Sequence, residues 1–514
     1  MHSDTETQKG GTVRSSCPHG GDHPPTLTEV SANLRAGADW ASRRDLPDID
    51  GWDDFNAAPD LVRQRLISRL QEGRCPSVAH TFPLPKTGKD EVRKMAWLNP
   101  YDDLYFRIIV GRVARAVEAA LGPDVFSYRL ADDPPAWSVR DVRVAFRLRR
   151  ERAQELLAEA GCNAIAVADL RHYYPSVEPE VVMNALYQAN APRGAVTLIG
   201  ELLRDLEPMG TPRGLPIGPE ASGVLGNIVL LELDKAISCR VRGHIRYTDD
   251  SWLFLRAETE WPDVHEVYAT SASDLGLEVN TSKVAVYPTG SKAAEHIIQH
   301  GQIAYLTSPA ATYRTPQRSA YELRGVLDRD EPDWVLAKFH LGSLRTAQSP
   351  RALPILREQP RLLQEIPHSV GQYLSAVVGC SQNRQQVDRD WLVEHATARP
   401  TARSLAGQLQ LCRVASQLRL GKDHGNRLVD LAADSDLRRH APLQAWAAKA
   451  WGSSKAHAPG RAVEYACHLG DFSVRRAFAL TLPPDASTPS KRSGWRRKLR
   501  SVDPDLAPTL ARLD

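Results

Sequence analysis

The chain has 514 residues, of which 42% are hydrophobic and 25% are charged. This is the composition of an ordinary soluble globular protein and excludes wholesale disorder. Its length suits about three units of roughly 100–200 residues, or one large catalytic core with an appendage. The net charge of +3 by itself neither indicates nor excludes nucleic acid, so any basic surface must be local.

The chain shows none of the signals of secretion or membrane insertion. It has no apolar run of about 18 residues, so we expect no transmembrane helix and no membrane partner. The start of the chain is polar and lacks the apolar run of a signal peptide, and the seven cysteines are scattered and odd in number. We therefore expect a cytoplasmic protein with reduced thiols.

The N-terminal part predicts a tail followed by helices and one hairpin. Residues 1–45 are expected to be disordered or poorly ordered, because the chain begins with Gly, Ser, Thr, His and Pro without periodicity. Helical spacing of apolar residues predicts helices over 59–72 and 101–121. Between them, Pro and Gly punctuate residues 82–88 and indicate an extended hairpin or loop.

A further helix is predicted over residues 141–160. Arg143, Arg147 and Arg150 recur along it at i, i+4 and i+7. These side chains share one face of a helix. Such a basic face either follows the phosphates of a nucleic acid or is simply solvated, and the sequence leaves both readings open.

The middle of the chain predicts a split-βαβ, or ferredoxin-like, α+β fold. The apolar stretch 163–170 is typical of a buried strand, and Thr248–Ser251 lies between two short apolar runs as the tip of a hairpin. The other elements expected in this region are an apolar helix over 219–238, a helix over 263–275, and short strands over 277–279 and 284–287.

Three acidic residues stand at the ends of these strands. Asp169 ends the first strand, and Asp249 and Asp250 occupy the tip of the hairpin. The first strand and the central hairpin are neighbours in a ferredoxin-like sheet, so Asp169 could lie beside Asp249. Clustered carboxylates repel one another unless a cation neutralises them, and Mg²⁺ prefers carboxylate oxygens and bridges to phosphates. Two adjacent ions can stabilise both oxygens of an in-line phosphoryl displacement. An acidic pair alone would be only a common turn feature.

Four segments together resemble, in the right order, the palm motifs of reverse transcriptases. They are Asp169-Leu-Arg-His-Tyr-Tyr-Pro-Ser-Val177, Gly214-Leu-Pro-Ile-Gly-Pro-Glu-Ala-Ser222, Tyr247-Thr-Asp-Asp250 and Leu275-Gly-Leu-Glu-Val-Asn-Thr-Ser-Lys283. The resemblance covers roughly residues 75–300 and implies a fingers-and-palm core. It also implies an RNA-directed DNA polymerase, a nucleotidyltransferase that uses dNTPs, an RNA template and two Mg²⁺ ions, which Mn²⁺ could replace.

The resemblance also implies a role for individual residues. Asp169, Asp249 and Asp250 would be catalytic and would hold the metal ions, together with the main-chain carbonyl of Leu170. Tyr174 would lie beneath the sugar and clash with a 2′-hydroxyl, the group that separates the two kinds of sugar. The remaining nucleotide-binding residues implied are Lys86 and Arg93 at the triphosphate, Pro216 and Gly218 in the second motif, and Lys283 at the leaving pyrophosphate.

One position departs from the retroviral pattern. Ile217 stands where retroviral and many intron-type enzymes carry Gln, and in this respect the chain resembles the abortive-infection and unknown-group reverse transcriptases of bacteria. That resemblance implies a role in antiphage defence, and a dedicated non-coding RNA is one template that it would allow. It leaves open template-independent or protein-primed synthesis, with the DNA product covalently attached. A nucleic-acid-binding scaffold with a vestigial polymerase site is the alternative of another class.

The C-terminal part predicts an all-α domain in place of a thumb. Strand signals fade after a fingers-and-palm unit over residues 46–330, and residues 331–514 are rich in helical segments. Pro442–Ala450 resembles Ser473–Thr481 at an offset of 31, which is typical of helical repeats, although an irregular bundle is an equal alternative. A homo-oligomer is compatible with the sequence.

A basic segment lies near the end of the chain. Residues 491–500 contain six basic side chains and no acid, including Arg496 and Arg497 beside Trp495. Cations around an aromatic ring suit single-stranded nucleic acid. A solvated surface is the alternative.

Overall fold

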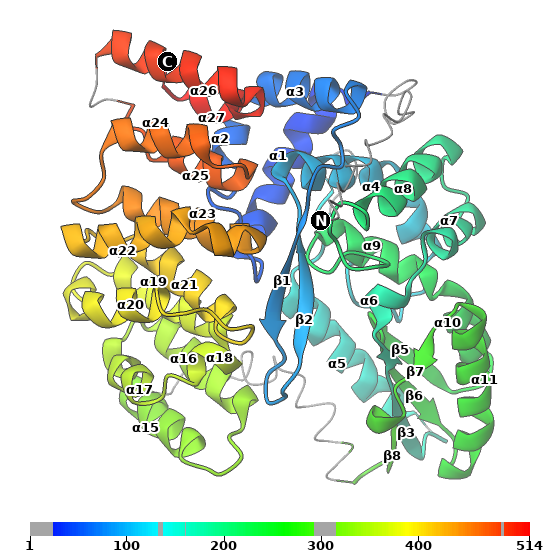
Figure 1. The fold of residues 1–514 in the computed structure, drawn as a ribbon. Coiled ribbons are helices and arrows are strands. Elements are labelled where there is room, and N and C mark those ends of the chain that lie inside the picture. The colour runs from blue at the N-terminus through cyan, green and yellow to red at the C-terminus, as the bar shows by residue number, and fades with distance from the viewer. Residues whose placement is uncertain are drawn as a thin grey trace, which may run out of the picture.

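The computed structural model describes residues 24–131, 137–159, 161–291, 294, 315–484 and 488–513. Figure 1 shows two bodies side by side, a mixed α/β part from blue to green and a stack of helices from yellow-green to red, with the β1–β2 hairpin between them. Of the helices in these described ranges, none is both long and apolar enough to cross a membrane.

The N-terminal segment corrects one sequence expectation. Residues 1–45 were predicted as a poorly ordered tail, yet helix α1 (Leu27–Arg43) begins with a capping box between Thr26 and Glu29. Val30 and Leu34 are fully buried in the core of the fingers and palm. This apolar stripe of helical period is hidden among polar residues, which explains the error. Residues 1–23 lie outside the described residues.

The fingers consist of helices and one antiparallel hairpin. The helices are α2 (Asp53–Asn56), α3 (Pro59–Gln71) and α4 (Pro100–Ala120), and the hairpin pairs β1 (His80–Pro85) with β2 (Val92–Trp97). Helix α4 is buried around nearly its whole circumference. It is therefore the central support on which the other fingers elements pack. Helix α5 (Val142–Ala158) follows and leads to the palm.

The palm is a four-stranded antiparallel sheet with the order β5-β6-β3-β8. The strands are β3 (Ala164–Ala168), β5 (Gly243–Tyr247), β6 (Asp250–Leu255) and β8 (Ala285–Pro288). In chain order these are the first, second, third and fourth strands of the split βαβ unit. The sheet order is therefore second, third, first, fourth, which agrees with the ferredoxin-like expectation. The short strands β4 (Leu170–Arg171) and β7 (Glu278–Val279) form a separate pair.

Helices cover both faces of the palm sheet. Ala164 and Ala166 belong to the core shared with the helices that follow β3, whereas Ile165 belongs to a smaller core that contains Ala153 and Leu156 of α5. The alternation follows from the two-residue period of a strand. The palm helices are α6 (Tyr173–Ser176), α7 (Pro179–Gln188), α8 (Arg193–Leu206), α9 (Glu220–Val229), α10 (Leu231–Ser238) and α11 (Trp261–Asp274).

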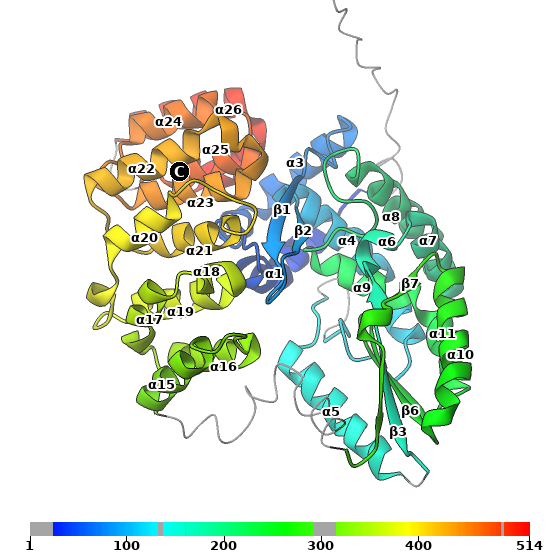
Figure 2. The same cartoon turned by 60° about the horizontal axis from the view of Figure 1, so that its bottom comes forward.

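The C-terminal part is helical throughout its described residues, as the sequence predicts, and its helices lie in successive layers (Figure 2). They are α15 (Pro316–Leu327), α16 (Trp334–Thr346), α17 (Leu353–Glu358), α18 (Leu362–Glu365), α19 (Pro367–Gly379), α20 (Arg389–Ala396), α21 (Leu405–Ala415), α22 (Lys422–Ala433), α23 (Ala441–Gly452), α24 (Pro459–His468), α25 (Phe472–Leu480), α26 (Pro489–Val502) and α27 (Ala507–Ala511).

The structure bears on two predictions for the helical domain, its boundary at residue 331 and its internal repeat. The boundary at residue 331 is wrong, because Leu323, Val326 and Leu327 of α15 are buried in the core of the helical domain. The two similar segments at an offset of 31 form α23 and α25, which pack against each other. Two neighbouring helices do not establish a repeat, which stays a prediction.

Buried ion pairs join the end of the chain to its beginning. Arg476 of α25 donates to Asp48 at 2.8 Å and to Asp54 at 2.6 Å, and all three side chains are buried. Asp505 accepts from Arg69 of α3 at 2.6 Å. Removing one partner of such a pair strands a buried charge. The helical domain is therefore firmly fixed to the fingers, as the proximity of α27 and α3 in Figure 1 shows.

Candidate active site

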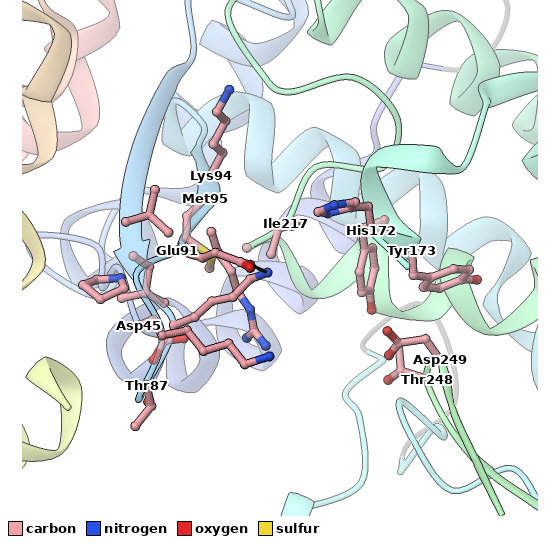
Figure 3. A pocket seen from close by; sticks show the side chains of 18 of the residues that line it. Asp45, Thr87, Glu91, Lys94, Met95, His172, Tyr173, Ile217, Thr248 and Asp249 are labelled. Atoms are coloured by element: carbon pink, nitrogen blue, oxygen red, sulfur yellow. Dashed lines mark hydrogen bonds and ion pairs between the residues drawn. The ribbon is translucent and has the colours of Figure 1, made fainter. Parts of the chain in front are cut away.

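A cleft of about 2300 Å³ separates the palm from the fingers hairpin and the helical domain. Its lining includes Asp169 and Asp249 from the palm, Arg93 from β2 and Lys338 from α16. Ligand pockets for small molecules are typically about 300–1,000 Å³. This cleft is therefore larger than a typical small-molecule pocket. Figure 3 shows Glu91 and Lys94 on one side of this cleft, Asp249 and Tyr173 on the other, and Ile217 between them.

The sheet register brings two of the predicted acidic residues together. Ala168 of β3 pairs with Ser251 of β6, so the residue after β3 and the turn before β6 lie at the same end of the sheet. Burial and, next, the negative charge of Asp169 raise the pKa of Asp249 to about 6, while Lys283 opposes the shift. Asp169 and Asp249 are thus close enough to repel each other, although they are separated by 80 positions in sequence.

Asp169 is held by the segment that follows β7. Its carboxylate accepts hydrogen bonds from Asn280 Nδ2 and from Lys283 Nζ, each at 2.9 Å. Its main-chain carbonyl accepts from the Asn280 N–H at 2.8 Å. The fourth sequence motif therefore has a local function, because it orients the carboxylate that the first motif supplies. Leu170, whose carbonyl was predicted to contact metal, is buried and pairs with Val279.

The third predicted carboxylate faces a different partner. Asp250 begins β6, and its Oδ2 accepts from Arg149 Nη2 at 2.7 Å. The guanidinium of Arg149 also lies 3.6 Å from the centre of the Trp252 ring. Within the described ranges, no three His, Cys, Asp or Glu side chains are close enough to hold one metal ion together. The negative charges of Asp169 and Asp250 both act on Asp249, while Asp250 is also hydrogen-bonded to Arg149; the shared metal site of the three carboxylates stays a prediction.

Sequence analysis missed Arg149, although a signal was present. Arg149 sits at helical spacing between Ala145 and Ala153, and all three are buried on the same face of α5. A cation that interrupts an apolar stripe needs an acidic or aromatic partner inside the protein. By contrast, the predicted Arg143 and Arg147 are exposed. Their role in nucleic-acid binding stays a prediction, as does that of Arg150.

The turn that carries Asp249 is held by Arg246. This arginine is 1% exposed and donates to both carboxylate oxygens of Asp234 at 2.7 Å. It also donates to the carbonyl of Thr248 at 2.9 Å. The Thr248 N–H donates to Ser127 Oγ at 2.8 Å, so both the N–H and the carbonyl of Thr248 are hydrogen-bonded. Thr248 has a φ of 57°, a left-handed conformation that such ties can hold in place.

Two tyrosines form the floor beside the acidic pair. Tyr174 of α6 lines the cleft and is hydrogen-bonded to the hydroxyl of Tyr128. Burial raises the pKa of Tyr128 to about 12, which keeps this hydroxyl protonated at neutral pH. Tyr128 packs on Gly223, where a Cβ would lie 2.2 Å from its ring. Tyr128 lies between the fingers and the palm, and sequence analysis did not select it as a site residue.

The second motif forms a loop clamped between the palm and the fingers. Gly214, with a φ of 80°, lies so near the carbonyl of Tyr174 that a Cβ would be 2.5 Å from it. Gly218, with a φ of 135°, approaches the carbonyl of Ala96 in the same way, at 2.8 Å. Pro216 is buried. No side chain fits at either glycine, so this loop conformation requires glycine at both positions; Ile217, between them, lines the cleft.

The cations predicted to bind the triphosphate lie on the fingers wall of the cleft. Lys86 forms an ion pair with Glu91 across the end of the hairpin, and Arg93 is exposed on β2. Lys283 lies on the palm side. The arrangement places positive charge on both sides of the space in front of Asp169 and Asp249.

The predicted site in the C-terminal segment is remote from the cleft. Trp495 of α26 packs partly against the core of the helical domain, which leaves less of its ring for stacking on bases. Arg497 is exposed, and α26 lies at the end of the helical stack farthest from α15 in Figure 1. Binding of nucleic acid by Trp495, Arg496 and Arg497 stays a prediction.

Comparison with known proteins defines the class of the central domain. Residues 85–308 match a family model described as reverse transcriptase (RNA-dependent DNA polymerase). The chain therefore contains a reverse transcriptase domain, and the enzyme class of that domain is RNA-directed DNA polymerase, a nucleotidyltransferase. Domains of this class generally use divalent metal ions such as Mg²⁺.

Solved structures of low sequence identity are also similar. One is telomerase from Candida albicans in complex with a fragment of telomeric RNA, at 11% identity and a TM-score of 0.30, covering 71% of this chain and 64% of the telomerase chain. Another is apo telomerase from Candida tropicalis, at 9% identity and a TM-score of 0.34, covering 75% and 73%. The chain thus spans less than two thirds of the first telomerase chain. Among curated proteins, no sequence matches.

Replacing Arg246 should damage both the stability of the protein and the Asp249 turn. In Arg246→Met, Asp234 loses its bidentate partner, and an unpaired charge of this kind costs about 3–5 kcal/mol. Arg246→Lys keeps a charge but not the planar fork, so it should recover only part of that loss. Urea unfolding measures the change. The exposed Arg256→Met, which removes a pair at 3.5 Å with Glu260, is the control. An Arg246→Met protein as stable as wild type would contradict the assigned role.

The raised pKa of Asp249 predicts a stability difference that depends on pH. The folded state binds this proton more tightly than the unfolded state, whose pKa is near 3.8. The contribution of Asp249 to the free energy of unfolding therefore falls as pH rises from about 4 to about 6. Without metal, Asp249→Asn should be up to about 3 kcal/mol more stable than wild type at pH 7.5 and of nearly equal stability at pH 4.

Urea unfolding in EDTA at the two pH values measures this difference. Added Mn²⁺ should then stabilise the wild type at pH 7.5 more than Asp249→Asn. Equal stability of the two proteins at both pH values would show that Asp249 is not held in a repulsive environment.

Proposed function

We propose that the protein is an RNA-directed DNA polymerase that extends a 3′-hydroxyl with dNTPs at the cleft between the palm and the fingers. The observation that carries this function is the pair Asp169 and Asp249, which the sheet register brings together in a cleft large enough for a polymer. A buried repulsive pair of carboxylates has the chemistry of a divalent cation site. The match of residues 85–308 to the reverse transcriptase family supports the same function.

The acidic residues would hold two Mg²⁺ ions, or Mn²⁺ in their place. Asp169 and Asp249 would be the principal ligands. The carbonyl of Leu170 would add a further contact, and so would the carboxylate oxygen of Asp250 that Arg149 does not bind. When bound, the ions would lower the pKa of the attacking hydroxyl and neutralise charge on the phosphates. Asp250 is already hydrogen-bonded to Arg149 through Oδ2, and such a partner commonly orients a carboxylate that binds a metal ion.

The cations around the acidic pair would bind the nucleotide. Lys86 and Arg93 would contact the triphosphate, Lys as a point charge and Arg as a fork. Lys283 Nζ, which now donates to Asp169, would be freed when a cation replaces it and would then lie near the departing pyrophosphate. Pro216 and Gly218 would shape the backbone that the nucleotide approaches.

A second mode of synthesis is favoured by one feature of the same cleft. Ile217 offers an apolar side chain where an amide could contact the template, and it packs against the core of the helical domain. We therefore retain template-independent or protein-primed synthesis as the alternative. The proposed biological role, antiphage defence, rests on the sequence resemblance to abortive-infection and unknown-group enzymes. Treating the purified protein with ribonuclease before DNA synthesis separates the modes, since only templated synthesis should be lost.

Loss of either central carboxylate should abolish DNA synthesis. Asp169→Asn and Asp249→Asn keep the size of the side chain and remove the charge that would hold a cation, so we expect losses of at least about 10³-fold in dNTP incorporation. Asp263→Asn, an exposed residue of α11, is the control and should retain activity. If both active-site variants synthesised DNA at the wild-type rate, the acidic pair would not be the catalytic site. If they kept full biological activity without DNA synthesis, the scaffold alternative would be favoured.

Tyr174 should select deoxynucleotides by its bulk. In Tyr174→Val the space beneath the sugar opens, and incorporation of rNTPs relative to dNTPs should rise by about 10-fold or more. Primer extension with each nucleotide class measures this ratio. Tyr187→Val, on the exposed side of α7, is the control. An unchanged ratio in Tyr174→Val would remove this tyrosine from sugar selection.

A further inference from the structure

The end of the fingers hairpin is attached to the helical domain. We call residues Lys86–Glu91, which join β1 to β2, the fingers tip. The Thr87 hydroxyl donates to the carbonyl of Glu365 at 3.1 Å, and the Gly88 N–H donates to the Glu365 carboxylate at 2.7 Å. Lys338 Nζ donates to the Thr87 hydroxyl at 3.2 Å. These contacts join the two parts more than 250 positions apart in sequence.

One arginine completes the attachment. Arg403, which precedes α21, donates to the carbonyl of Lys89 at 2.9 Å and to the carboxylate of Asp90 at 2.7 Å. It also forms an ion pair with Glu365. Glu365 thus binds both the fingers tip and the arginine that holds it. Glu365 is 14% exposed and Arg403 27% exposed, so the pair is partly shielded from water and is stronger than an open surface pair.

The backbone of the fingers tip is suited to this contact. Gly88 has a φ of 70°, and a Cβ there would lie 3.3 Å from the Trp334 ring of α16. Other side chains rarely adopt this conformation. The tip therefore lies against α16 as well as against the Glu365–Arg403 pair, and the attachment joins it to two successive layers of the helical domain.

The fingers tip contains Lys86, one of the two cations predicted to bind the triphosphate, and ends next to the strand that carries the other, Arg93. Lys86 begins the fingers tip, and Arg93 follows it on β2, where it pairs with Leu84. Both side chains line the cleft. Fixing the tip at its far end therefore limits how far Lys86 and Arg93 can move from the cleft. Groups held in place before a ligand arrives lose less entropy when it binds.

We propose that Glu365 and Arg403 are positioning residues for the incoming nucleotide: they hold the fingers tip so that Lys86 and Arg93 already stand in the cleft. Through this pair the helical domain contributes to nucleotide affinity by an indirect route, because Arg403 acts on the fingers tip. This inference rests on the proposed function, since it assumes that the nucleotide enters this cleft.

Arg403→Ala tests the inference, because it removes two contacts to the tip and the ion pair with Glu365 and leaves the acidic pair untouched. We expect the KM for dNTPs to rise about tenfold while kcat changes less than about twofold, because the tip binds substrate and does not carry the chemistry. Arg403→Lys should recover part of the loss. Arg324→Ala, which removes an exposed pair at 2.8 Å with Glu358 in the same domain, is the matched control and should leave KM unchanged.

Two measurements separate this inference from the proposed function. Hydrogen exchange of residues 86–91 should be faster in Arg403→Ala than in wild type or in Arg324→Ala. Fluorescence anisotropy with a labelled dNTP should show the same loss of affinity even if no DNA is made. An unchanged nucleotide affinity in Arg403→Ala, or unchanged exchange of the tip, would overturn the positioning role. Absence of DNA synthesis in the wild type, with normal nucleotide binding, would instead contradict the proposed function.

Discussion

The repulsion between Asp169 and Asp249 is the constraint around which the rest of the site is organised. Burial and, next, the negative charge of Asp169 at the same end of the sheet raise the pKa of Asp249 to about 6. A fold keeps such a pair only when the surrounding structure holds both groups in place. Asn280 and Lys283 hold the first aspartate, and Arg246 holds the turn of the second. These contacts keep the two carboxylates together in spite of their repulsion, which the proposed divalent cations would relieve.

Each of the four sequence motifs has a distinct physical task in this arrangement. The first contributes Asp169 and the tyrosines of α6, and the third contributes Asp249. The second is a loop whose two glycines allow close contact with the backbones of the palm and the fingers. The fourth orients Asp169 and supplies Lys283. The motifs are thus parts of one hydrogen-bonded unit, which explains why their order and spacing were informative.

The helical domain does more than occupy the side of the cleft opposite the palm. Buried ion pairs from Arg476 and Asp505 fix it to the N-terminal helices at one end, and the Glu365–Arg403 pair joins it to the fingers tip at the other. Attachment at two places is mechanically different from a contact at one, because rotation about either contact is prevented by the other. The cleft is therefore bounded by parts that are held in a defined relation before substrate binds.

The sequence alone determined the split-βαβ palm, the helical character of the C-terminal part and the residues that line the palm side of the cleft. It could do so because the hydrophobic period of a strand or helix can be recognised within a short segment. In addition, four motifs in the order of one family leave few folds compatible with the sequence. Only the tertiary structure decided the partners of those residues. That Arg149 binds Asp250, that Arg246 ties the turn and that Arg403 holds the fingers tip depends on contacts between elements far apart in the chain. The misplaced boundary and the missed helix α1 have the same cause, because the burial of a short apolar stripe is decided by what packs against it.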